Sequence, residues 1–158
     1  MDTTIPKILL EICGACQPQE KILFVTDKHL APIAKRMFDA TPEYPNRRIV
    51  TIEKERNMHG QDPESAIAEA MYQSDVIYGI TKYSLFHTQA RRDAVANGAR
   101  YVNMVDYNMQ MLEPGSSIDC DFIGIGETCT RIANALTDRK TCRITTRRGT
   151  DFSCSIEG

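Results

Sequence analysis

Short apolar runs alternate with amphipathic segments along most of the chain. Four of the runs have the length and nearly continuous apolar character of strands that are covered on both faces, as in a parallel sheet. They cover 21–26, 48–53, 75–80 and 100–105. Between and after them, apolar residues recur at helical spacing, which predicts helices over 6–16, 29–40, 63–73, 88–97, 107–112 and 119–138.

This alternation of strands and helices predicts an α/β fold over 1–158, a single domain with a three-layer, Rossmann-like sheet. The sheet is expected to be mostly parallel, with helices on both faces. Two further strands, 141–145 and 152–156, flank Arg148-Gly149 and predict a hairpin at the edge of that sheet. The chain stops directly after the second of these strands, so we expect it to be the N-terminal half of a longer two-domain polypeptide.

Composition narrows the class of protein. A hydrophobic content of 42% is enough for one continuous core. The charge is nearly balanced, with 19 basic and 21 acidic residues, and this favours neither nucleic acid nor a membrane as partner. No apolar run approaches the roughly 20 residues that cross a bilayer, and no leader segment begins the chain, so a cytoplasmic protein is expected. The six cysteines lie mostly in periodic apolar segments and are expected to be reduced core thiols.

The chain contains none of the common nucleotide or metal motifs. It has no G-x-G-x-x-G, no phosphate-binding P-loop and no H-E-x-x-H. Cys13 and Cys16 have C-x-x-C spacing, but they end a predicted helix, where the dipole disfavours a thiolate. The histidines are few and scattered, so no metal site is predicted inside this chain.

The loop after the third predicted strand, 81–88, carries the richest chemistry. Parallel sheets bind ligands beyond the carboxyl ends of their strands, and this loop runs from a buried strand straight into a helix. Ser84, His87 and Thr88 could each cap that helix. Alternatively, His87 faces a substrate pocket and exchanges a proton there, while Arg91 and Arg92 hold a carboxylate. The sequence leaves both interpretations open.

Three passages together resemble the aminopeptidase T-like family. Residues 84–91 with 98–100 are similar to its Ser-Leu-x-His-Thr-x-Ala-Arg and Gly-Ala-Arg signature. Residues 109–112 resemble its Glu-Glu-Met-Leu segment, although Asn108 and Gln110 replace acidic positions. The ending, 143–146 with 149–152, is similar to its (Val/Ile)-x-(Val/Ile)-Thr and Gly-Thr-Asp-Leu pattern. The order and spacing of these passages agree over about residues 70–158.

The resemblance implies the N-terminal, substrate-side domain of a metallohydrolase of the leucyl aminopeptidase type. It implies that the metal ligands, and a divalent zinc, cobalt or iron ion, belong to a C-terminal catalytic domain that this chain lacks. This chain alone would then bind no catalytic metal and show no activity, and its partners would be that domain and a small peptide. The implied substrate-pocket residues are Ser84, Phe86, His87, Thr88 and Arg91, with Thr150 and Asp151 as secondary candidates.

Two alternatives stay open. Dihydroxypyridine dioxygenase, an iron enzyme that cleaves a small aromatic substrate, shares the architecture, and Phe152 matches its Gly-Ser-Asp-Phe turn better, whereas Ser84 and Thr88 match the peptidases. The non-enzymatic hypothesis is a stand-alone module that binds a small ligand or a partner. In a truncated enzyme an apolar interdomain patch would be exposed, so a homodimer or aggregation would be unsurprising.

Overall fold

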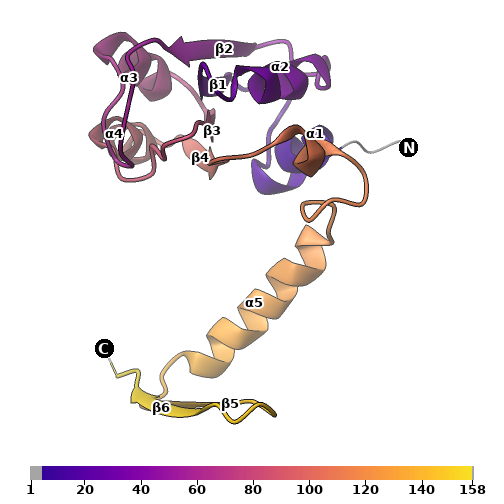
Figure 1. Ribbon diagram of the computed structural model, residues 1–158, viewed down its shortest axis with the longest axis vertical. Coiled ribbons are helices and arrows are strands. Elements are labelled where there is room, and N and C mark those ends of the chain that lie inside the picture. The colour runs from indigo at the N-terminus through magenta and orange to yellow at the C-terminus, as the bar shows by residue number, and fades with distance from the viewer. Residues whose placement is uncertain (1–4, 158) are drawn as a thin grey trace. The chain divides into compact units, whose positions relative to one another are not determined.

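The computed structural model describes residues 5–157, and the chain divides into two compact units, Met1–Cys120 and Asp121–Gly158. The sequence predicts one domain over this length. Figure 1 shows the first unit as a layered α/β structure and the second as a helix followed by a hairpin. The candidate site lies in the first unit, and each unit is described by itself.

A four-stranded parallel sheet organises the first unit, with strand order β2-β1-β3-β4. Its strands are β1 (Ile22–Asp27), β2 (Arg47–Ile52), β3 (Val76–Ile80) and β4 (Arg100–Asn103). Each begins and ends within two residues of its predicted range. Every residue of β3 is buried, as are the first five of β1, which explains why both read as continuous apolar runs.

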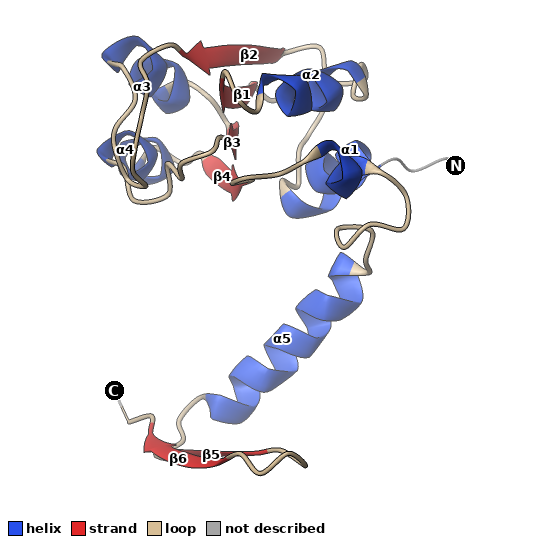
Figure 2. Cartoon of the chain, viewed as in Figure 1, coloured by secondary structure: helices blue, strands red, loops and turns tan. Residues whose placement is uncertain are grey.

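Helices cover both faces of this sheet, as Figures 1 and 2 show. One face carries α1 (Ile5–Ile8), a π-helical turn η1 (Leu9–Cys13) and α2 (Ala31–Asp39). The other carries α3 (Ser65–Tyr72) and α4 (Gln89–Ala96), whose apolar residues pack with Leu23, Val25 and Ile77. The three-layer, Rossmann-like fold predicted from the sequence is therefore confirmed. The helix predicted over 6–16 forms, but its geometry changes from α to π at Leu9.

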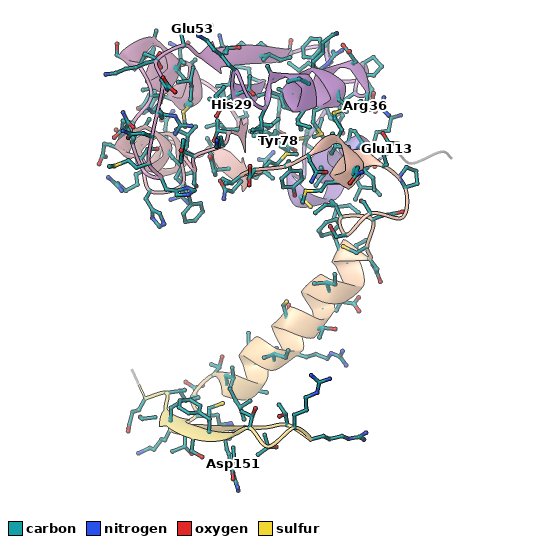
Figure 3. The ribbon with its side chains drawn as sticks, viewed as in Figure 1. His29, Arg36, Glu53, Tyr78, Glu113 and Asp151 are labelled. Atoms are coloured by element: carbon teal, nitrogen blue, oxygen red, sulfur yellow. The ribbon has the colours of Figure 1, made fainter. Side chains whose placement is uncertain are left out.

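Tyr78 connects β3 to the N-terminal helical turn (Figure 3). Its hydroxyl donates to the carbonyl of Leu9 at 3.1 Å and lies 3.3 Å from Sγ of Cys16. Burial raises the pKa of the Cys16 and Cys13 thiols, which disfavours the reactive thiolate in this C-x-x-C pair. All six cysteines are free, but only Cys16 is buried, so the prediction of core thiols holds for that residue alone.

The second unit consists of α5 (Phe122–Leu136) and the antiparallel strands β5 (Thr141–Thr145) and β6 (Asp151–Ser155). Asp121 caps α5 by accepting a hydrogen bond from the Gly124 N–H at 2.9 Å. Gly149, at φ 99°, turns the hairpin through the left-handed region. The predicted hairpin forms, but its strands make a separate two-stranded sheet instead of extending the edge of the parallel one.

Within the second unit, the hairpin leaves the apolar side of α5 uncovered. Ile125 and Ile132, which lie on the same side of the helix, are 49% and 55% exposed. Helical spacing identifies which side of a helix is apolar, but it carries no information on what covers that side. No helix of the described residues has both the length and the apolar character needed to cross a membrane.

Candidate functional site

The strand order places a crevice at the carboxyl ends of β1 and β3. The connection from β1 leads to β2 on one side of β1, whereas β3 pairs with β1 on the other side. Ligands of parallel α/β folds bind where the strand order changes direction in this way, at the topological switch point. A pocket of about 260 Å³ lies here, lined by residues 27–29 after β1, residues 52–56 at the end of β2, and Tyr83 after β3. Figure 3 labels His29 and Glu53 on the first two of these segments.

Asp27, the last residue of β1, joins two of the loops that form this pocket. Its Oδ1 accepts hydrogen bonds from the N–H groups of His29 at 3.0 Å and Leu30 at 3.1 Å. Its Oδ2 accepts one from the N–H of Lys82, in the loop after β3, at 2.7 Å. Three backbone donors therefore fix this carboxylate, and it fixes the two loops in turn.

Arg56 places a buried positive charge at the pocket. Its side chain is only 3% exposed. Nη2 donates to the carbonyl of Tyr83 at 2.7 Å and lies 4.0 Å from Oδ2 of Asp27, whereas Nη1 is 3.5 Å from the carbonyl of Gln61. Nε is buried and has no hydrogen-bond partner among residues 5–157. Burial lowers the pKa of Arg56, and the negative charge of Asp27 acts in the opposite direction.

The rim of the pocket carries charges of both signs. Lys28 and Glu53 form an exposed ion pair at 3.7 Å. The backbone N–H of Lys54 donates to Oε1 of Glu64 at 2.7 Å, which fixes the segment after β2 to the start of α3. Burial raises the pKa of Glu64, but hydrogen bonds from the backbone, including that of Lys54, outweigh it and leave the pKa below its ordinary value. Among the described residues, no carboxylate lies within 4.0 Å of the Lys54 ammonium.

Ser84 and Thr88, predicted to line a substrate pocket, are buried and shape the turn into α4. Oγ of Ser84 accepts from the N–H of Phe86 at 3.0 Å, and the N–H of Ser84 donates to Nδ1 of His59 at 3.0 Å. Oγ1 of Thr88 accepts from the N–H of Arg91 at 3.2 Å as the N-cap of α4. Of the residues that could cap α4, Thr88 is the N-cap, whereas the Ser84 hydroxyl stabilises the turn before the helix and donates to Oδ1 of Asn103 at 3.3 Å.

Phe86, His87 and Arg91 form a cluster on the outside of the same turn. Phe86 is 40% exposed, and its ring meets the exposed His87 ring edge-on with centroids 5.2 Å apart. The Arg91 guanidinium stacks over the Phe86 ring at 4.3 Å. The structure therefore brings the five predicted residues of this loop together, but none of them lines the pocket. Tyr83, directly before Ser84, does.

The secondary candidates belong to the hairpin of the second unit. The N–H of Thr150 donates to Oγ1 of Thr146 at 3.2 Å. Asp151 pairs with Arg143 through two hydrogen bonds of 2.7 Å, and this pairing lowers the pKa of Asp151. Both residues take part in local interactions across the turn.

Sequence reasoning missed Arg56, Lys54 and Tyr83 as site residues. The position of Lys54 and Arg56 could have identified them, because the segment 54–62 follows a strand and therefore begins at the same edge of the sheet. The polar composition of that segment indicates a solvent-exposed loop, and nothing in it predicts that Arg56 becomes buried.

Within 5–157, no three His, Cys, Asp or Glu side chains lie close enough together to hold a metal ion. Comparisons with models of protein families, with curated proteins and with solved structures gave no match. The resemblance to the aminopeptidase T-like family thus stays a prediction that rests on the motifs.

Proposed function

We propose that this chain is the N-terminal, substrate-side domain of an aminopeptidase T-like metallohydrolase, and that the pocket at the switch point binds part of the substrate. One observation supports this most directly. The loop that carries the family-like motif, 81–88, also supplies a wall of the pocket through Tyr83. The loop with the motif and the pocket meet at the carboxyl end of β3.

In this proposal the chain positions the substrate and contributes no metal ligand. Asp27 and Arg56 hold the pocket loops in place, and the exposed Phe86 and His87 offer an aromatic surface beside them. The divalent metal would be held by the C-terminal domain and would activate water there. A cytoplasmic location belongs to the same proposal.

The test compares the complete gene product with the 158-residue chain. Both are purified with zinc, cobalt or iron and assayed for release of amino acids from a set of dipeptides. The complete product should turn over with at least one metal, and the 158-residue chain should bind no metal stoichiometrically and show no turnover. A complete product that is inactive on every dipeptide would contradict the hydrolase assignment, and ring cleavage by its iron form would support the dioxygenase instead.

A stand-alone binding module is the second candidate, and one observation favours it. The pocket is lined entirely by residues between 27 and 83, so ligand binding requires no second domain. A reading frame that ends after Gly158, with ligand binding by the chain as it stands, would support this function. A reading frame that continues for another domain with metal ligands would exclude it.

A further inference from the structure

The buried guanidinium of Arg56 has more donors than the described residues satisfy. An arginine carries five N–H donors and no acceptor. Here one donor makes a short bond, from Nη2 to the Tyr83 carbonyl at 2.7 Å, and a second reaches only 3.5 Å. Nε has no hydrogen-bond partner within 5–157. Oε2 of Glu64 and the hydroxyl oxygen of Tyr101 are also buried without a partner among the described residues, and both groups act on the pKa of Arg56, but neither forms a hydrogen bond with the guanidinium. Because a buried cation is costly unless it is paired and hydrogen-bonded, an acceptor from outside the chain would stabilise it.

Asp27 cannot supply that acceptor. It is the carboxylate nearest to Arg56 among the described ion pairs, but its two oxygens already accept from the backbone N–H groups of His29, Leu30 and Lys82. Those bonds hold it 4.0 Å from Nη2, beyond hydrogen-bond distance. Asp27 therefore balances part of the charge of Arg56 while leaving its donors free.

We propose that the pocket holds an oxyanion group, a carboxylate or a phosphate, of a small molecule, with Arg56 as its principal donor. The planar fork of a guanidinium matches the oxygen spacing of both groups. Lys54, which lines the same pocket and has no carboxylate partner within 5–157, supplies a second positive charge. The inference rests on the proposed role of the pocket as a ligand site, but not on any metal chemistry.

The pocket also carries negative charges, so positive charge alone does not select the ligand. Asp27, Glu53 and Glu55 offset Lys28, Lys54 and Arg56, so the lining is balanced overall. Recognition would then come from the placement of Arg56 and Lys54 and not from a broad positive field. Ile52 and Tyr83 provide an apolar wall for the remainder of the ligand, and about 260 Å³ suits a small molecule.

The test is a titration of the ¹⁵N-labelled 158-residue chain with acetate and, separately, with inorganic phosphate, at constant ionic strength set with sodium chloride. At least one anion should shift the amides of 27–29, 53–56 and 83 saturably, with a Kd of about a millimolar, as expected for so small a probe. Lys54→Ala should raise Kd about threefold to fivefold, and Arg56→Lys about tenfold because the fork is lost. Lys35→Ala, on α2 and outside the pocket, should leave Kd unchanged.

Saturation by acetate alone identifies a carboxylate ligand, and saturation by phosphate alone a phosphorylated one. The inference is overturned if neither anion saturates, or if Kd is the same in all three variants. If circular dichroism shows that Arg56→Lys does not fold, the map of shifted amides and the effect of Lys54→Ala on Kd still test the oxyanion site. Because dipeptide hydrolysis by the complete gene product is measured separately, failure of one proposal is distinguishable from failure of the other.

Discussion

The hydroxyl of Tyr101 lies over Gly79, in the space that a Cβ at position 79 would occupy. The two residues belong to the neighbouring strands β4 and β3, and the missing side chain lets the phenol reach across the sheet. Burial raises the pKa of Tyr101, although the nearby charges of Arg56 and Arg91 act in the opposite direction. The phenol therefore stays protonated and packs as part of the core beneath α3 and α4.

Replacing Gly79 by Ala should destabilise the first unit. The new methyl group meets the Tyr101 ring and hydroxyl, and overpacking of this kind costs about 1–3 kcal/mol. Urea unfolding gives the change in the free energy of unfolding. Gly126→Ala is the control, because a Cβ there meets nothing within 4 Å and alanine favours the helix by about 1 kcal/mol. Equal losses in both variants would contradict the packing of Tyr101 on Gly79.

Removing the carboxylate of Asp27 should lower the free energy of unfolding by more than its partial exposure suggests. Asp27→Ala deletes three hydrogen bonds from backbone N–H groups and leaves the buried Arg56 charge without its neighbour, so we expect a loss of about 3–5 kcal/mol. Thermal or urea unfolding measures it. Asp39→Ala breaks only an exposed pair with Lys35 and should change stability by at most about 0.5 kcal/mol. A comparably small loss for Asp27→Ala would show that the pocket loops do not depend on it.

The pair of Glu20 and Arg100 should make stability depend on acid pH. The hydrogen bond from Arg100, at 2.6 Å, lowers the pKa of Glu20 below its ordinary 4.5. Protons therefore bind the unfolded chain more readily, so the stabilisation is present above pH 4.5 and is lost as pH falls through the lower folded value.

Glu20→Gln should remove that dependence and cost about 0.5–1 kcal/mol at neutral pH, since Arg100 is part-exposed and solvent screens the pair. Urea unfolding from pH 7 to 3 tests it. Glu43→Gln, which breaks an exposed pair with Lys7, is the matched control. Parallel stability curves for wild type and Glu20→Gln below pH 4.5 would rule out this contribution.

The apolar side of α5, which the hairpin of its own unit leaves uncovered, should make the chain associate with itself. Sedimentation or light scattering should show an average mass that rises with concentration, because exposed apolar patches of this kind drive association. Ile125→Glu with Ile132→Glu should suppress the rise. Thr130→Glu with Asn134→Glu adds the same charge to other exposed positions of the helix and should not. If both double variants behave alike, net charge and not the apolar side controls association.

The fold was largely predictable because β1 and β3 are buried on both faces and so appear in the sequence as unbroken apolar runs. The exceptions have physical reasons. The change from α to π geometry at Leu9 accompanies the tertiary hydrogen bond from Tyr78, which no local pattern encodes. The exposure of Ile132 depends on the surroundings of α5, and periodicity is silent on those.

The edge of the sheet that carries the site was also predictable, whereas the residues that form it were not. Ser84 and Thr88 have side chains that suit either a ligand or a helix cap, and only the geometry shows that their oxygens accept from backbone N–H groups. Arg56 lies in a polar segment, and its burial follows from contacts with Tyr83 and Asp27 that come from distant parts of the chain. Local composition cannot report such long-range pairing.

The double attachment of Asp27 has a consequence for the rate and strength of binding. One carboxylate holds the loops after β1 and β3 in fixed positions before any ligand arrives. The loops therefore lose little conformational entropy when a ligand binds. The pocket is preorganised, so even a ligand with few contacts can use most of its interaction energy for affinity, and association needs no slow rearrangement of the loops.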